Sequence, residues 1–545
     1  MSDADSLVIG IDAGTSVMKA VAFTLAGAQI DVAARPNRYT AGADGSATQD
    51  MDRTWADCAA TLRELAERIP GLARRTAAIA VTGQGDGTWL VGAGNRPVGE
   101  AWLWLDARAA ARTERLRRGP GERTRFETTG TGLSTCQQGP QLAEIAATEP
   151  ERLARAETAM HCKDWLFLNL TGIRASDPSE ASLGFGDFRT RAYDDSVIAA
   201  LGLSRYRRLL PTIIDGSEQT CPLDAAAAAA TGLRAGTPVS LGFMDIVSSG
   251  LGAGVYTRDT PAACTIIGST GIHMRAVRNA DFHLNAEGTG YAIALPVPGL
   301  VAQIQSNMAA TLNLDWVLTL AADIAGQFGE RPAPQAVMGR IEAWLEASAP
   351  GAMLYHPYIS DAGERGPFID PQARASFIGL RMGHRFADLV RAVIEGLGMA
   401  GRDCYAAMGE IPADVRLSGG AARSPGLRRL LSAAIGAPVR ISARGEAGAA
   451  GAAMMAAVAI GAYRSMDDCL DEWVVPRLGA LESPDPRLTT FYARHFDSYR
   501  VARDALPPVW SALASERSAA DLTLSAAPLP VSVSAQMRKD ERLKA

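Results

Sequence analysis

The stretch LVIGIDAGTSVMKAVAFTL, residues 7–25, decides the fold of this 545-residue chain. Two apolar runs flank the polar cluster at 12–16, and this pattern predicts two strands joined by a tight turn, a β-hairpin. A second stretch of the same kind, AACTIIGSTGIHMR, occupies residues 262–275. The repetition predicts two halves built on a related plan, with a cleft between them.

Strands and helices alternate around both hairpins. In the first half, a helical pattern at 54–69 precedes an apolar strand at 77–83. In the second half, DVRLSGGAARSPGLRRLLSAAIG, residues 414–436, reads as a strand, a glycine-rich turn and a helix. Such alternation is typical of an α/β fold. A single helix is expected at 141–157, and a helix of small residues at 446–463.

The length of the chain favours more than one domain. We expect a first α/β domain at residues 1–255 and a second at 256–515. The remaining segment, 516–545, is rich in Ala, Ser and Pro, and we expect it to be a mobile tail.

Composition argues against several classes of function. A formal net charge of −5 leaves no large basic field that would hold nucleic acid or an anionic membrane. Seven scattered cysteines argue against a disulfide framework and favour a reducing compartment. No signal peptide or long apolar run is visible. We expect a cytoplasmic protein that holds any phosphate ligand locally, through backbone N–H groups, a few side chains or a metal.

The first hairpin turn has the residues of an anion site. Gly14 frees the backbone so that N–H groups can point at one anion, and Thr15 and Ser16 add hydroxyl donors. Asp12, at the end of the preceding strand, would repel a phosphate unless a cation lay between them, which points to Mg²⁺. An ordinary β-turn would explain the same residues.

The second hairpin turn repeats this chemistry. Gly268 lets Ser269 and Thr270 approach a phosphate closely, and two such turns in matching places favour a nucleoside triphosphate clamped across the cleft. In the later glycine-rich turn, Gly419 and Gly420 leave room for a flat ring beside a helix N-terminus. Plain turns and tight strand–helix packing are the alternatives.

A third group of polar and aromatic residues lies at predicted strand ends. Gln84 and Asp86 supply hydrogen-bonding groups, and Trp104 supplies an aromatic wall, which together suit a polyhydroxylated ligand. Core packing would also account for Trp104. Asp106 and Arg108 are expected to form an ion pair that is at least partly structural.

Asp245 lies in GFMDIVSSGLGAG, residues 242–254, a stretch without Lys or Arg. A hydroxyl group that attacks phosphorus must lose its proton, and a carboxylate placed against it can accept that proton. A neighbouring cation would pair with the acid and weaken it as a base. The alternative is a helix N-cap, since IVSSGLGAG could begin a helix, and both roles are compatible.

In combination these motifs resemble the FGGY carbohydrate kinases, within the actin-like ATPase superfamily. The resemblance implies two actin-like (ribonuclease H-like) ATPase domains that flank a catalytic cleft, with Mg–ATP mostly on the second and the substrate mostly on the first. The similar motifs occur in order over residues 7–465: IGIDAGTSVMKAVAF, TGQGDG, WLWLDAR, KDWLFLNLTG, SDPSEAS, GFMDIVSSGLGAG, GSTG, YHPYISDAGERGPF and LSGGAARSP.

The resemblance also implies roles for matching positions. Asp245 matches the catalytic base, and Asp12 matches the acid near the metal and the γ-phosphate. The expected ATP-binding residues are Gly14, Thr15, Ser16, Gly268, Ser269, Thr270, Gly419, Gly420 and Ser424, and the expected substrate-binding residues are Gln84, Asp86, Trp104 and Asp245.

The particular residues that this chain has within the family motifs imply ATP-dependent phosphorylation of a terminal hydroxyl of a small polyol, the four-carbon erythritol. Ile246 after the base and Gly85 before Asp86 depart from many members, and both count against a pentulose or glycerol. The alternatives are an FGGY kinase for another polyol or sugar, such as glycerol, a pentitol or xylulose, and a non-catalytic actin-fold regulator that binds ATP or sugar. The resemblance to the family also suggests that the protein forms a homodimer.

Overall fold

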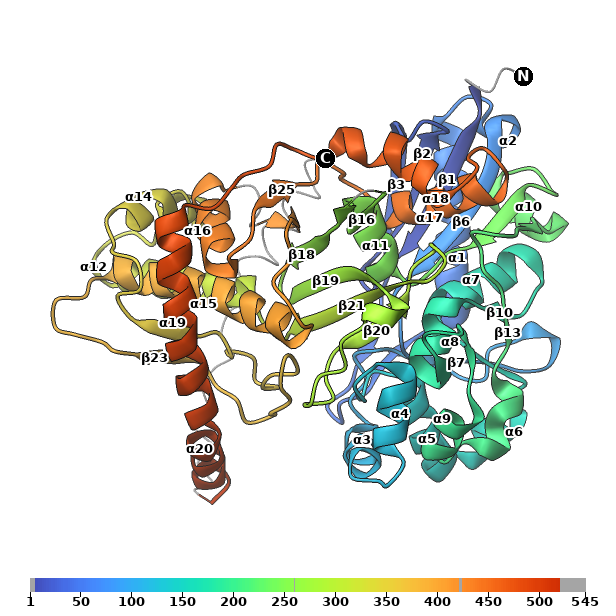
Figure 1. The fold of residues 1–545 in the computed structure, drawn as a ribbon. Coiled ribbons are helices and arrows are strands. Elements are labelled where there is room, and N and C mark those ends of the chain that lie inside the picture. Colours follow the sequence, from blue (N-terminus) through green and yellow to red (C-terminus); the bar gives the residue numbers. More distant parts are fainter. Residues whose placement is uncertain (1–4, 259, 421–423, 520–545) are drawn as a thin grey trace.

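Two six-stranded sheets with matching strand order form the centre of the molecule (Figure 1). The computed structural model describes residues 5–258, 260–420 and 424–519. The first sheet runs in the order β14 (Cys221–Pro222), β15 (Pro238–Leu241), β6 (Thr76–Gly83), β1 (Leu7–Ala13), β2 (Val17–Thr24) and β3 (Gln29–Pro36). The second runs in the order β25 (Val439–Ile441), β24 (Val415–Ser418), β18 (Ala263–Ile267), β19 (Gly271–Arg278), β21 (Leu300–Asn307) and β20 (Tyr291–Ala294).

The two predicted hairpins occupy equivalent places in these sheets. β1 pairs antiparallel with β2 and parallel with β6. β18 in turn pairs antiparallel with β19 and parallel with β24. The expected α/β architecture, with two halves on a related plan, is therefore confirmed. The turns that follow β1, β6 and β18 all reach the region between the two halves.

The alternation of side chains along β1 explains how the first sheet is covered on both faces. Leu7, Ile9 and Ile11 pack into a core with α1 (Met51–Arg68), α7 (Cys162–Thr171) and α10 (Ala225–Thr231). Val8 points to the opposite face, as a period of two requires. Both faces are buried, so the strand is apolar from Leu7 to Ile11.

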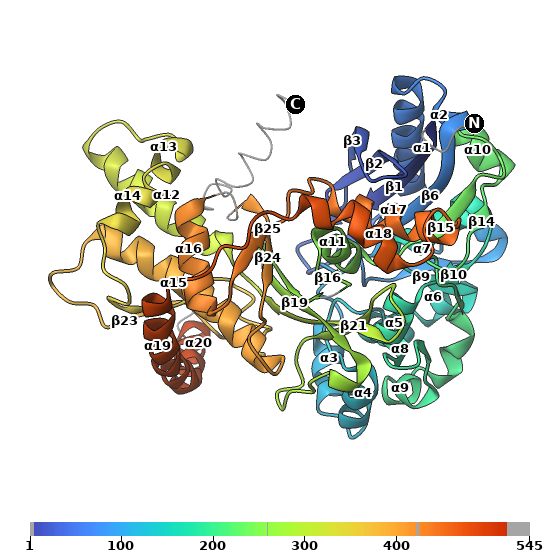
Figure 2. The same cartoon turned by 45° about the horizontal axis from the view of Figure 1, so that its top comes forward.

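Two helices of small residues lie between the sheets, α11 (Asp245–Ala253) and α17 (Ala447–Ala459). Figure 2 shows α17 and α18 (Met466–Trp473) beside β1 and β6. A Cβ atom on Gly451 of α17 would lie 2.0 Å from the carbonyl oxygen of Ser248 in α11. This close approach explains why the predicted helix at 446–463 is built from Gly and Ala.

The return of α17 to the first sheet bears on domain organisation. Residues 447–473 come from the second half of the sequence, yet they share a core with β1, β2 and β6. The division at residue 255 stays a prediction, because packing crosses it at α17.

The remaining helices extend each half outward from its sheet. The helix expected at 141–157 is two helices, because Pro150 has no N–H to continue the ladder and Glu149 leaves helical geometry (φ −133°, ψ 51°). The first half carries α3 (Ala110–Arg117), α4 (Glu122–Thr129), α5 (Gln138–Thr148), α6 (Pro150–Arg155), α8 (Pro178–Phe185) and α9 (Asp195–Ala200). The second carries α12 (Thr311–Phe328), α13 (Pro334–Met338), α14 (Ile341–Glu346), α15 (Phe386–Ala407), α16 (Pro425–Ile435), α19 (Pro486–Ala505) and α20 (Pro507–Ala519).

The C-terminal segment is partly helical. α20 runs to Ala519, into the segment expected as a mobile tail, and residues 520–545 lie outside the described residues. All seven cysteines are free thiols, as expected. Among the described helices none is long and apolar enough to cross a membrane.

Candidate active site

A cavity of about 230 Å³ lies between the two halves. It contains predicted residues from both sides, since Thr15, Asp86, Trp104 and Asp245 line it together with Thr270. The other residues that line it are Gly85, Cys136, Leu183, Met244, Ile246, Ile272, Tyr291, Ile293, Ser306 and Arg365. The structure thus brings three of the four predicted polyol residues, Asp86, Trp104 and Asp245, and one residue of each hairpin turn to one place.

Asp245 is the first residue of α11, and the N-cap position belongs to Met244. The N-cap interpretation of Asp245 is therefore wrong, although the helix does begin here. Burial, followed by the neighbouring carboxylates of Asp12 and Asp86, raises the pKa of Asp245 to about 7, although the backbone N–H groups of Ile246 and Gly85 oppose the shift. The result is a carboxyl group that exchanges its proton near neutral pH.

Asp12 lies at the end of β1, half-buried beside the start of α17. A Cβ atom on Gly448 would come within 2.7 Å of its Oδ2. Burial, with a smaller contribution from Glu446, raises the pKa of Asp12 to about 6, although the charge of Lys19 opposes the shift. Lys19 is shared, because its Nζ lies 2.7 Å from Oε2 of Glu446, so it neutralises Asp12 only in part.

The carboxylate of Asp12 suits a magnesium ion. It is an oxygen ligand of the kind that Mg²⁺ prefers, and its charge reaches Asp245, whose pKa it raises. Within the described ranges no cluster of three or more His, Cys, Asp or Glu side chains could hold a metal. An ion here would therefore complete its coordination with phosphate oxygens and water, as Mg²⁺ commonly does.

A chain of hydrogen bonds orients Trp104. Its Nε1 donates to Oγ1 of Thr15 (2.8 Å), and this hydroxyl donates to Oε1 of Gln84 (3.2 Å). Gln84 is buried, and its Nε2 donates to Oε1 of Gln49 (2.9 Å). Gln84 does not line the cavity; it fixes Thr15, and Thr15 fixes the indole ring. The hydroxyl of Thr15 is engaged on the Trp104 side, and its role toward ATP stays a prediction.

The second hairpin turn is held through its main chain. The carbonyl of Gly268 accepts from the N–H of Thr311 (2.9 Å), and that of Ser269 accepts from the N–H of Ala310 (2.7 Å). These bonds fix the turn against the start of α12. Because β18 and β24 are neighbours, Gly419 lies beside this turn, and a Cβ on it would be 2.4 Å from the carbonyl oxygen of Ile267.

Ser424 forms the N-cap of α16. Its Oγ accepts from the N–H of Leu427 (3.3 Å) and donates to Oε1 of Glu342 (2.6 Å). The intervening residues 421–423 lie outside the described residues. A contact of Gly420 or Ser424 with adenosine therefore stays a prediction, as does the role of Ser16 at the exposed tip of the first turn.

Asp106 and Arg108 form the expected structural ion pair. Asp106 is buried and accepts from the N–H of Ala47 (2.9 Å), and Nη2 of Arg108 lies 2.5 Å from its Oδ2. The Arg108 guanidinium also covers the ring of Trp102 at 3.7 Å. Neither charged residue lines the cavity.

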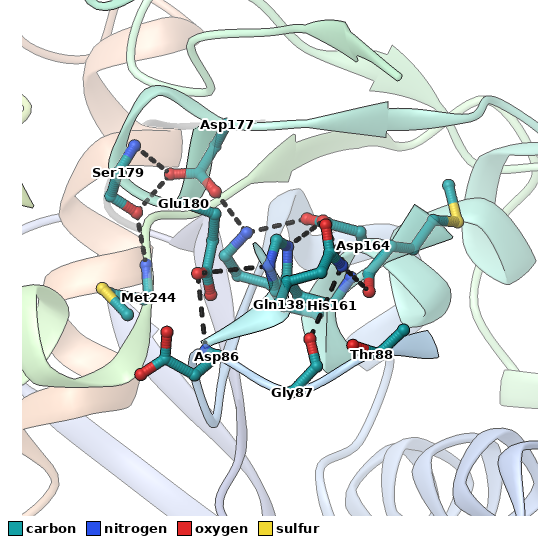
Figure 3. A network of polar contacts seen from close by, with 12 residues as sticks. Asp86, Gly87, Thr88, Gln138, His161, Asp164, Asp177, Ser179, Glu180 and Met244 are labelled. Atoms are coloured by element: carbon teal, nitrogen blue, oxygen red, sulfur yellow. Dashed lines mark hydrogen bonds and ion pairs between the residues drawn. The ribbon is translucent and has the colours of Figure 1, made fainter. Parts of the chain in front are cut away.

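Sequence reasoning missed a buried charged network behind the cavity (Figure 3). His161 Nδ1 lies 3.1 Å from Oδ2 of Asp164, and its Nε2 lies 3.6 Å from Oε2 of Glu180. Lys163 pairs with Asp164 (2.7 Å) and with Asp177. All five side chains are buried.

This network supports two parts of the cavity wall. Oε2 of Glu180 accepts from the N–H of Asp86 (3.4 Å), which has a left-handed backbone (φ 57°). Asp177 holds Ser179, and Oγ of Ser179 accepts from the N–H of Met244 (3.0 Å), the residue before Asp245. Burial raises the pKa of Glu180 to about 8, although His161 and Lys163 oppose the shift.

Met244 occupies the place that a side chain on residue 85 would take. The absence of a side chain at Gly85 therefore leaves no open space in the cavity wall. A Cβ on Gly85 would lie 2.1 Å from Cε of Met244, so the Met244 methyl group occupies that position. Together with Leu183 and Ile246, Met244 gives the cavity an apolar wall.

The fold and the cavity together define a class of protein. The model of the N-terminal domain of the FGGY family of carbohydrate kinases matches residues 7–252, and that of the C-terminal domain matches residues 242–460. The chain belongs to this family, and its two halves are the actin-like α/β domains of that fold.

Particular relatives extend this finding. Erythritol kinase of Brucella abortus (strain 2308) is 63% identical over 516 residues, which cover 94% of this chain and 99% of that protein. Xylulose kinase of Escherichia coli (strain K12) is 29% identical over 513 residues, 92% of this chain and 100% of the relative. The crystal structure of xylulose kinase from Rhodospirillum rubrum superposes with a TM-score of 0.83 at 26% identity, over 93% of this chain and 100% of that one.

Proposed function

We propose that the protein is an ATP-dependent erythritol kinase, which transfers the γ-phosphoryl group of ATP to a terminal hydroxyl of erythritol. The observation that carries the proposal is the cavity in which Asp245 lies with Asp86, Trp104 and the two hairpin-turn residues. The 63% identity to the Brucella erythritol kinase supports the choice of polyol.

Asp245 acts as the general base. Its pKa of about 7 means that the ionised form is well populated at neutral pH and that proton uptake is favourable, the condition under which a base works best. It takes the proton from the attacking hydroxyl as the bond to phosphorus develops. Such assistance contributes roughly 10²–10⁴-fold to the rate.

The polyol lies against the first half. Asp86 accepts hydrogen bonds from hydroxyl groups, and the indole of Trp104 packs on the C–H face of the carbon chain. Met244 and Ile246 form the apolar wall beside the reacting carbon. This combination of fixed polar groups and apolar surface is what a small polyhydroxylated ligand requires.

ATP lies between the two hairpin turns, with its phosphates facing the backbone of Gly14–Ser16 and Gly268–Thr270. Asp12 would hold Mg²⁺ together with phosphate oxygens and water, and the ion would supply positive charge beside the phosphates. The adenosine lies toward Gly419, Gly420 and Ser424.

A polyol panel tests the proposal. ADP release is measured with erythritol, glycerol, xylitol and xylulose, each with Mg²⁺ and with the ion chelated. We expect the highest kcat/KM for erythritol, and no turnover without Mg²⁺. A higher kcat/KM for glycerol, xylitol or xylulose would assign another substrate, whereas ATP binding without turnover on any polyol would indicate a regulator.

A further inference from the structure

Arg365 brings a positive charge from the second half into the polyol cavity. It lies in the segment between β22 (Leu354–His356) and β23 (Ser376–Ile378), and it lines the cavity together with Asp86 and Cys136 of the first half. None of the roles assigned above involves this residue. The two halves therefore present opposite charges to one small space.

The backbone around Arg365 is fixed by its neighbour Glu364. This carboxylate is 2% exposed, and its Oε1 accepts from the N–H groups of Met308 (2.8 Å), Arg365 (2.9 Å) and Gly366 (3.4 Å). The loop is thereby tied to the end of β21. The backbone that carries the guanidinium is therefore fixed on the second half, and any movement of that half carries the guanidinium with it.

The guanidinium still has an unused donor. Its Nη2 donates to Oγ of Ser306 (2.7 Å), but its buried Nε has no hydrogen-bond partner among the described residues. A buried N–H that is left without a partner is costly, so an arrangement of this kind favours a ligand that supplies an acceptor.

Arg365 acts on one end of the cavity. Its charge lowers the pKa of Asp86 and of Cys136, although burial, the largest influence, raises both. Sγ of Cys136 donates to Oδ2 of Asp86 (3.2 Å), which places these groups together. Asp12 and Asp86 are the charged side chains that shift the pKa of Asp245 most, so Arg365 acts on the Asp86 side of the cavity more than on the base itself.

We propose that Arg365 binds the hydroxyl at the end of the polyol farthest from the transferred phosphate, and that this hydroxyl bridges Arg365 of the second half to Asp86 of the first. A hydroxyl group both donates and accepts, so it can donate to the carboxylate and accept from the guanidinium. Closure of the two halves then depends on the chain length of the polyol. The inference rests on the proposed function.

Kinetics of Arg365→Met test this contact. The substitution keeps much of the apolar stem and removes the charge and the donors. We expect KM for erythritol to rise about 10–100-fold, with kcat and KM for ATP changed less than about threefold. The kcat/KM for glycerol, which lacks the fourth carbon and its hydroxyl, should change less than about threefold. Arg381→Met, at an exposed position of the same half, is the matched control.

The rise in melting temperature on binding erythritol is a second test, because it would be unaffected by Arg365→Met if Arg365 had only a structural role. Erythritol should raise the melting temperature of the natural protein and of Arg381→Met but not of Arg365→Met, whereas ATP should stabilise all three. Arg365→Lys, which keeps the charge, should give an intermediate KM. Equal losses for erythritol and glycerol, or a changed KM for ATP alone, would overturn the proposal.

The polyol panel, measured on the natural protein, distinguishes failure of the erythritol assignment from failure of the proposed Arg365 contact. If that protein prefers another polyol, the erythritol assignment fails there, before any variant is measured. Arg365→Met is then compared on the preferred polyol and on its homologue shorter by one carbon. The expected selective loss on the longer substrate is the same.

Discussion

The polyol end and the nucleotide end of the cleft are supported in different ways. Behind Asp86 and Met244 lie the buried charges of Lys163, Asp177 and Glu180, which hold the cavity wall through side chains. The turn at Gly268–Thr270 is instead tied to the start of α12 by two main-chain hydrogen bonds.

This difference follows from what each end would bind. Hydroxyl groups on adjacent carbons are distinguished only by side chains fixed in position, and such fixing needs a further layer of contacts. Phosphate groups accept hydrogen bonds from any backbone N–H that points at them. We therefore expect substitutions at the polyol end to have large effects and those at the nucleotide end to have small ones.

The largest expected effect is on catalysis. Asp245→Asn removes the proton acceptor while keeping the shape of the side chain, so kcat should fall roughly 10²–10⁴-fold. A coupled ADP assay measures this at saturating polyol. Turnover close to that of the natural protein in a folded variant would show that another group takes the proton.

Stability provides the control for that variant, and its sign can be worked out. The pKa of Asp245 is about 7 in the folded protein, above the ordinary value of about 4, so the folded state binds the proton more tightly. This contribution to stability is present below pH 4 and is lost as the pH rises through 7. Asp245→Asn avoids that loss, so at pH 8 it should melt a few degrees higher than the natural protein.

Lys163→Met tests the buried network. The substitution leaves Asp164 and Asp177 without their shared cation, and breaking a buried pair in this way costs about 3–5 kcal/mol of unfolding free energy. Urea denaturation measures the change. Lys19→Met, which breaks the more exposed pair with Glu446, should cost about 1 kcal/mol or less. Equal costs would show that burial of the network contributes little.

Gly85→Ala probes the packing at the cavity wall. The new methyl group would overlap Cε of Met244, and the displaced side chain would enter the polyol cavity. We expect KM for the polyol to rise about tenfold, since overpacking of this kind costs about 1–3 kcal/mol. Adding Met244→Ala should restore part of the affinity, and a double variant with purely additive losses would contradict the steric explanation.

The smallest effect is expected at the nucleotide end. Ser424→Ala removes the N-cap of α16, which costs about 1 kcal/mol of stability. KM for ATP should change less than about threefold if recognition there relies on the backbone. An increase of tenfold or more would show that the Ser424 hydroxyl contacts the nucleotide, and the contrast between the two ends would weaken.

Local sequence patterns predicted the parts of the fold that depend on neighbouring residues. The hairpins around Gly14 and Gly268, and the strand before Gly419, each follow from apolar runs that end in polar turns. The start of a helix at Asp245 could be predicted from the residues IVSSGLGAG that follow it. The structure confirms that Thr15, Asp86, Trp104, Asp245 and Thr270 reach one cavity.

The buried network could not be predicted in this way, because local structure explains its residues equally well. Asp177 is the N-cap of α8, and Asp164 belongs to a capping box at the start of α7. Their pairing through Lys163 depends on how two helices meet. One signal was present in the sequence: Lys163 is a lone cation beside the apolar run WLFLNL.

The positions of Arg365 and Met244 at the cavity also could not be predicted, because each depends on contacts with residues that are distant in the sequence. Arg365 lies 279 positions after Asp86, and only the closing of one half on the other brings both to the cavity. The Met244 methyl group occupies the space beside Gly85, and no local sequence pattern indicates this contact.

The Lys19–Glu446 pair has a practical consequence for amine chemistry. The sequence has four lysines, and the described residues include two, Lys19 and Lys163. The Lys163 side chain is fully buried, whereas that of Lys19 is 32% exposed. Acylating reagents would therefore meet a single accessible side-chain amine on the described surface, beside Asp12. Coupling of Lys19 to an amine-reactive resin would cancel the charge next to the candidate metal site, so a tether that does not react with amines suits this protein better.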